Sequence, residues 1–136
     1  MDERNNSENK INIRTEVEIG LDISTSVIGV CVLEKETGDI LELSNIKLTS
    51  AKFSNLWEKA TEFENYILSS KFSQNGEYSI TRVYVEANAK MFTPGFSSAD
   101  TILTLAKFNG ICSYIIFKNF GLAVTDINVT SARSKL

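Results

Sequence analysis

Apolar and polar residues alternate along the first ordered segment that the sequence predicts. Between residues 17 and 24 every second residue is apolar, which is typical of a β-strand with one face against a core. These apolar residues are Val17, Ile19, Leu21 and Ile23. A tight turn at 25–26 leads into a second, almost wholly apolar strand over 27–33, and a glycine turn at 36–39 leads into a third over 40–48. Three strands with short connections predict an antiparallel meander.

Two later segments have helical periodicity. In the first, apolar residues recur at spacings of three and four and form one stripe. The stripe consists of Phe53, Leu56, Trp57, Ala60, Phe63 and Ile67, and the polar residues Glu58, Lys59, Glu62 and Glu64 are predicted to lie away from it. The second helix is predicted to start at a Ser98 cap, to run to about Lys118 and to be apolar on most sides. Such a helix is either sandwiched inside the domain or shared with a second subunit.

Two more strands complete the predicted order β-β-β-α-β-α-β. They cover 81–86 and 122–129, and the segment 87–97, which holds the only proline, reads as a loop. Helical crossovers make the first strand parallel to these two, so the fold class is α/β (α+β): a five-stranded mixed sheet with helices packed on it. The polar residues 1–15 are predicted to be a disordered tail ahead of one domain spanning 16–136.

Composition removes several classes of function. The 136 residues include no histidine, so histidine-based nucleophile triads and zinc sites built on histidine and cysteine are excluded. The two cysteines, Cys31 and Cys112, are predicted to be buried, reduced thiols of a cytoplasmic protein. No apolar run approaches the eighteen residues of a membrane-spanning helix. The net charge of −3 gives no overall support to nucleic-acid binding.

Two carboxylates interrupt apolar strand runs. Asp22 lies in the first strand and Glu86 at the end of the fourth. Strand interiors disfavour Asp, and a charge near a core is costly unless it is paired. A divalent cation draws carboxylates together, so we expect these two to share one. The alternatives are that Asp22 accepts hydrogen bonds from the turn amides of Ser24 and Thr25, and that Glu86 is a strand-end charge facing water.

These residues also carry a resemblance to a family. The segments are Ile19–Ser26, Val83–Ala87, the helix part Leu105–Gly110 and the final Ser131–Leu136. In order and spacing they resemble the RuvC-type Holliday-junction resolvases, especially those of phages, within the RNase H-like superfamily. The resemblance implies a structure-selective, metal-dependent DNA endonuclease that resolves branched DNA. It also implies that Asp22 and Glu86 are catalytic residues that bind Mg²⁺ or Mn²⁺.

The family pattern continues beyond this sequence. It includes a final helix with two further acidic residues, which would follow the segment 131–136, and the sequence stops first. We therefore expect a domain truncated at its C-terminus, with its last helix missing. Two-metal phosphodiester hydrolysis needs two cations about 4 Å apart, and two carboxylates are a poor scaffold for them. Little or no cleavage is expected from this chain alone.

The resemblance also implies partners. Branched DNA is the expected substrate, and a homodimer through the helix at 98–118 would match a two-fold substrate. Ala106 and Gly110 form a small-residue patch on that helix, although plain core packing explains it equally. Candidate DNA contacts are Lys90, Phe92, Lys107, Arg133 and Lys135, and solvated surface charge is the competing interpretation of each basic residue. A phage-encoded protein would act in the host cytoplasm.

Two other functions fit the same pattern. The segment 19–26 followed by a hairpin also resembles the first phosphate-binding motif of sugar-kinase and actin-like ATPases, of which this chain would be a fragment. Stabilisation by ATP would favour that interpretation, and binding to four-way junctions would favour the resolvase. The third possibility is a non-catalytic nucleic-acid-binding module on the same fold.

Overall fold

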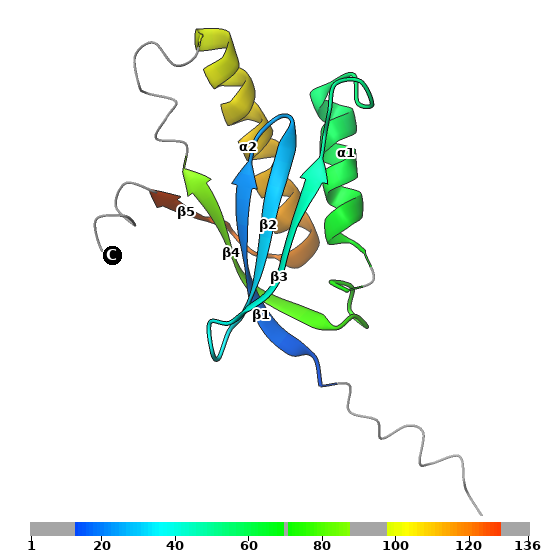
Figure 1. Cartoon of the computed structure of the whole chain (residues 1–136), viewed down its shortest axis with the longest axis vertical. Coiled ribbons are helices and arrows are strands. Elements are labelled where there is room, and N and C mark those ends of the chain that lie inside the picture. Colours follow the sequence, from blue (N-terminus) through cyan, green and yellow to red (C-terminus); the bar gives the residue numbers. More distant parts are fainter. Residues whose placement is uncertain (1–12, 70, 88–97, 129–136) are drawn as a thin grey trace, which may run out of the picture.

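The computed structural model describes residues 13–69, 71–87 and 98–128, which contain five strands and two helices (Figure 1). The elements are β1 (Thr15–Ile23), β2 (Val27–Glu34), β3 (Ile40–Lys47), α1 (Leu56–Ile67), β4 (Tyr78–Ala87), α2 (Ala99–Phe120) and β5 (Thr125–Asn128). Their order along the chain is the predicted one.

The strands form a single mixed sheet in the spatial order β3-β2-β1-β4-β5. β2 is antiparallel to both β1 and β3, whereas β4 is parallel to β1 and to β5. The predicted meander and the two parallel crossovers are therefore confirmed.

Strand bounds differ from the prediction at several ends. β1 begins at Thr15, inside the predicted tail of 1–15, and it ends at Ile23 before Ser24. β4 begins three residues early because Thr15 pairs with Tyr78, a contact between distant segments that no local pattern reveals. The Arg14 guanidinium strengthens this pairing by donating hydrogen bonds to the carbonyls of Ser73 (2.7 Å), Gly76 (3.1 Å) and Tyr78.

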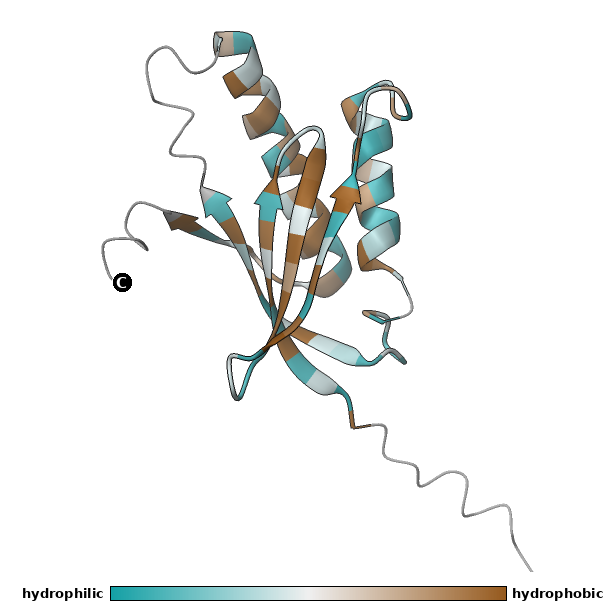
Figure 2. Cartoon of the chain, viewed as in Figure 1, coloured by the Kyte–Doolittle hydropathy of each residue, from teal (hydrophilic) through white to brown (hydrophobic). Residues whose placement is uncertain are grey.

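Both helices cover the same face of the sheet, and the core lies between them and the strands (Figure 1). The alternating apolar residues of β1 all point into this core, as predicted. Phe63 of α1 and Phe108 of α2 are fully buried against them. Figure 2 shows the resulting pattern of apolar and polar residues along the central strands. The opposite face carries no helix within the described residues, and we call it the open face.

Two residues of α1 differ from the prediction. The sequence pattern predicts a buried Trp57, which is 60% exposed, and predicts that Lys59 lies outside the buried stripe, although it is only 7% exposed. The helix begins at Leu56, after Phe53, so its buried side is centred on Ala60, Phe63 and Ile67. The Lys59 side chain borders that side, and its ammonium donates a 2.5 Å hydrogen bond to the carbonyl of Thr25 in the β1–β2 turn.

Helix α2 is packed on one side only. Ser98 caps it as predicted, because its hydroxyl accepts the Thr101 amide (3.2 Å), and Gly121 ends it at a φ of 68°. The buried residues are Phe108, Cys112, Ile115 and Ile116, whereas Leu103, Tyr114 and Phe117 are exposed. The interpretation of a helix sandwiched inside the domain is therefore wrong.

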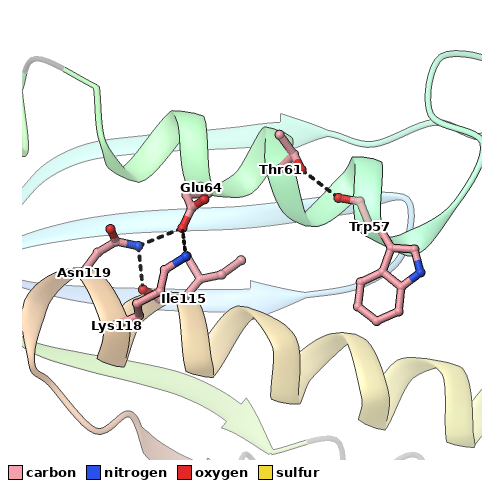
Figure 3. Close-up of polar contacts among 6 residues, drawn as sticks. All are labelled: Trp57, Thr61, Glu64, Ile115, Lys118 and Asn119. Carbon is pink, nitrogen blue, oxygen red and sulfur yellow. Dashed lines mark hydrogen bonds and ion pairs between the residues drawn. The ribbon is translucent and has the colours of Figure 1, made fainter.

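A polar cluster joins the two helices (Figure 3). The Glu64 carboxylate accepts hydrogen bonds from Lys118 and from Asn119, both at 2.9 Å. These hydrogen bonds lower the pKa of Glu64, and the Glu64 carboxylate in turn raises the pKa of Lys118. The cluster fixes the orientation of α1 against α2 at the end of α2.

The cysteines occupy different environments. Cys112 is buried in α2, and burial raises its pKa to about 12. Cys31 is only half-buried because it lies on the open face, so the prediction that both thiols are buried is wrong for this one. Neither forms a disulfide. Among the described helices, none is long and apolar enough to cross a membrane.

Candidate functional site

Strands β1 and β4 bring Asp22 and Glu86 to the same place on the sheet. Their register pairs Leu21 with Val85, so the next residue of each strand lies beside the other. Neighbouring strands are about 4.8 Å apart, and successive side chains alternate between faces. Because Leu21 and Val85 point into the core, Asp22 and Glu86 both belong to the open face.

The site is more accessible than the sequence predicted. Asp22 is exposed and Glu86 is half-buried. The apolar neighbours of Asp22 do not surround it, since they point to the helix-covered face. The cost of placing a charge near the core therefore does not apply to the Asp22 side chain. What remains is the proximity of two carboxylates on a face open to solvent.

Two glycines leave space next to Asp22. Gly29 is directly opposite Asp22 on β2, and a Cβ atom there would lie 3.6 Å from the Asp22 Cβ. Gly20 precedes Asp22 on the same face and pairs with Tyr84. Neither glycine has a positive φ, so the missing side chain rather than backbone freedom distinguishes them. Sequence reasoning did not single them out, although a glycine inside a strand is itself a signal of close approach.

The turn after β1 is closed without Asp22. The Ser24 hydroxyl donates to the Val27 carbonyl (2.7 Å) and accepts from the Val27 amide (3.1 Å). Within residues 13–69, no hydrogen bond joins the Asp22 carboxylate to the amides of Ser24 or Thr25. The alternative interpretation of Asp22 as a turn-capping residue is therefore wrong.

A cationic group lies further along the open face. Arg82 of β4 is exposed, pairs in register with Glu18, and donates a 3.4 Å hydrogen bond to the Tyr84 hydroxyl. The hydrogen bond to Tyr84 raises the pKa of Arg82. Every second residue of β4 from 82 to 86 lies on the open face: Arg82, Tyr84 and Glu86. Together they place a cation, a phenol and a carboxylate in one row along the strand.

The site offers ligands for one hard cation. Carboxylate oxygens completed by water are the ligands that Mg²⁺ prefers. Among the residues that the structure describes, no group of three or more acidic or cysteine side chains could hold a metal ion. Asp126 does not extend the pair, because it is in register with Val85 and so belongs to the other face. The described residues therefore fit one hydrated ion and do not form a two-metal centre.

Comparison with known proteins identifies the fold. Thermus thermophilus RuvC in complex with a Holliday junction substrate superimposes with a TM-score of 0.65 at 14% identity, over 89% of this chain and 69% of that one. A second T. thermophilus RuvC structure gives a TM-score of 0.57 at 17% identity, over 82% and 63%. The chain has the RuvC fold. No family model and no curated protein sequence matches it.

The likeness confirms the predicted RNase H-like architecture and extends no further than the fold, because the identity is low. A phage origin stays a prediction. Of the predicted DNA contacts, Lys90, Phe92, Arg133 and Lys135 lie outside the described residues. Lys107 is exposed on α2. Because α2 covers the face of the sheet opposite to Asp22, Lys107 does not lie on the open face.

Proposed function

We propose that this domain is a metal-dependent endonuclease of the RuvC type that acts on branched DNA. The supporting observation is the register of β1 and β4, which places Asp22 and Glu86 side by side on the open face of a RuvC-like sheet. The proposal covers the domain from residue 16 onward.

Asp22 and Glu86 would hold Mg²⁺ or Mn²⁺ through their carboxylate oxygens. When bound, the cation lowers the pKa of an attacking water and stabilises negative charge that develops on the scissile phosphate. Gly20 and Gly29 keep the surface beside Asp22 low enough for a phosphate backbone to approach. Arg82, on the same face, offers a fixed positive charge to a neighbouring phosphate.

One cation is all that this carboxylate pair supports. Two-metal hydrolysis also needs ligands for an ion on the leaving-group side, which the described residues do not supply. The resemblance to resolvases implies that those ligands lie on a further acidic helix. We accordingly propose that this carboxylate pair, without further ligands, supports binding of branched DNA and only weak cleavage.

A four-way DNA junction tests this function. We expect the protein to bind the junction more tightly than a linear duplex of the same sequence, and Mg²⁺ to change that binding. Asp22→Asn should abolish the Mg²⁺ effect, and Asp126→Asn, an exposed carboxylate on the other face, should retain it. Rapid junction cleavage by the 136-residue chain would refute the proposed weak activity.

The same titration distinguishes the alternatives. Junction binding that is unchanged by Mg²⁺ and by Asp22→Asn would indicate a non-catalytic nucleic-acid-binding module. Stabilisation by ATP without junction binding would indicate the kinase-like fragment. Either result would contradict the endonuclease proposal.

We further propose that the protein is a homodimer through α2. An exposed, mainly apolar stripe follows its outer side at helical spacing and consists of Leu103, Ala106, Gly110, Tyr114 and Phe117. Leu103 is 67% exposed, Tyr114 62% and Phe117 56%, a large apolar area to leave in water. A two-fold pair of helices meeting at Ala106 and Gly110 would cover it and provide two sites for a two-fold substrate.

A further inference from the structure

The only tryptophan of the chain is on the surface. Trp57 lies in the first turn of α1 and is 60% exposed. Figure 3 shows its indole directed from α1 toward α2, on the same side of α1 as Thr61 and Glu64. A tryptophan buries more apolar area than most side chains when it finds a partner, so an exposed one is typical of a binding surface.

A lysine lies over this ring. The Lys107 ammonium, from α2, is 5.2 Å from the centroid of the Trp57 ring, a cation–π distance. Among the described residues, Lys107 forms no salt bridge. Glu64, the acid of α1 on the same side as Trp57, is already paired with Lys118 (Figure 3). The Trp57–Lys107 pair is therefore a positively charged aromatic surface.

Two other acidic residues of α1, Glu58 and Glu62, lie on other sides of the helix. Glu58 and Glu62 follow Trp57 by one and five residues, which places them about 100° and 140° around the helix from it. Glu58 also accepts hydrogen bonds from the amide and hydroxyl of Ser54, at 2.7 and 3.0 Å. They do not cancel the charge beside the indole.

The pair lies near the edge of the sheet that carries the carboxylates. β3 runs in the same direction as β1, since both are antiparallel to β2, so β3 ends at the edge where Asp22 and Glu86 lie. α1 follows β3 after residues 48–55, and Trp57 is in its first turn. Trp57 therefore lies at the same end of the sheet as the carboxylates (Figure 1).

We propose that Trp57 and Lys107 bind an unpaired nucleotide of the DNA substrate. The base stacks on the indole, and the ammonium contacts the adjacent phosphate. Aromatic rings combined with lysines are the usual means of holding single strands without sequence preference, because every base has a face to stack. The proposal rests on the proposed function, since it assigns a further contact to the same DNA.

Intrinsic fluorescence tests the contact directly, because Trp57 is the only tryptophan. We expect an unpaired oligonucleotide, and a four-way junction with unpaired nucleotides at its centre, to quench the fluorescence, and a blunt duplex to leave it nearly unchanged. Binding is followed independently by the anisotropy of labelled DNA. Trp57→Ala should weaken the affinity for the oligonucleotide by about tenfold, roughly the effect of one lost stack, and Trp57→Phe by less.

Lysine variants separate charge from fold. Lys107→Gln should weaken binding to the oligonucleotide and reduce the slope of log affinity against log salt by about 0.7, the value for one phosphate contact on a single strand. Lys35→Gln is the matched control, because Lys35 is an exposed lysine paired with Glu16 on another part of the molecule, and should leave both quantities unchanged. Thermal unfolding of each variant checks that the fold persists.

Three outcomes would overturn the proposal. In the first, the protein binds the junction, Trp57→Ala leaves the affinity unchanged, and DNA does not change the fluorescence of the native protein. The proposed contact is then wrong, and the endonuclease proposal stands. If no DNA binds to the protein, both proposals fall together. If Trp57→Ala changes the monomer–dimer equilibrium and not the affinity for DNA, the surface belongs to a second copy of the chain.

Discussion

At the scale of single residues, the candidate site depends on what surrounds Asp22. Its carboxylate is exposed on a sheet face with no helix among the described residues, and Gly29 opposite it contributes no side chain. The sequence predicted the carboxylate pair because Asp22 and Glu86 interrupt apolar runs. It could not predict the exposure, because alternation shows that two faces differ and not whether anything covers the second one.

Filling the space at Gly29 should weaken metal binding without harming the fold. A Cβ there meets the Asp22 Cβ at ordinary contact distance, and valine favours strands, so we expect Gly29→Val to change stability by less than about 1 kcal/mol. The branched side chain would crowd the carboxylate and weaken Mn²⁺ binding by roughly tenfold. Cys31→Val, two residues along on the same face, is the control for calorimetric titration. Normal Mn²⁺ affinity in Gly29→Val would show that this space is not used.

At the scale of elements, periodicity predicted which segments are strands and helices but not how a helix is rotated. Trp57 and Phe63 both fit the spacing of the α1 stripe, yet only Phe63 is buried. The rotation of α1 places Ala60, Phe63 and Ile67 in the core, and Glu64 and Lys59 make polar contacts with α2 and the β1–β2 turn. All these contacts join residues far apart in sequence. For the same reason the sequence did not reveal the Trp57–Lys107 pair.

The Glu64 cluster predicts a pH-dependent contribution to stability. Because the folded-state pKa of Glu64 is lowered, its contribution is present at neutral pH and is lost as the pH falls through that lowered pKa. Glu64→Gln should therefore lower the free energy of unfolding at pH 7 by up to about 1 kcal/mol, and the difference should vanish in acid. Glu62→Gln, which removes a half-buried carboxylate outside this cluster, is the control. Denaturant unfolding at pH 7 and pH 3 measures both, and an equal deficit at both pH values would contradict the assignment.

At the scale of the whole molecule, the sheet order and the fold followed from the sequence because short connections and helical crossovers leave few topologies. The β1–β4 register, unlike the sheet order, could not be predicted from the sequence. An irregularity between Val17 and Glu18 shifts the pairing, and no sequence pattern marks it. That register decides whether Asp22 and Glu86 lie side by side. The sequence therefore predicted the two residues, and the structure supplied their proximity.

The exposed stripe of α2 predicts self-association. We expect a dimer in sedimentation velocity at micromolar concentrations, and a monomer when Leu103 and Tyr114 are both replaced by Glu, because two buried charges would oppose contact between the helices. Leu43→Glu, at a 70% exposed leucine on β3, should leave the dimer intact. A native protein that sediments as a monomer would exclude α2 as a dimer interface.

Whether Asp22 and Glu86 share one cation is decided by a double-mutant cycle of Mn²⁺ affinity. Titration calorimetry on the native protein, Asp22→Asn, Glu86→Gln and the double variant gives the coupling between the two carboxylates. A shared ion predicts one site per chain, a large loss in each single variant and little further loss in the double variant. Full Mn²⁺ affinity in either single variant, or losses that simply add, would show that the two carboxylates do not act on a common ion.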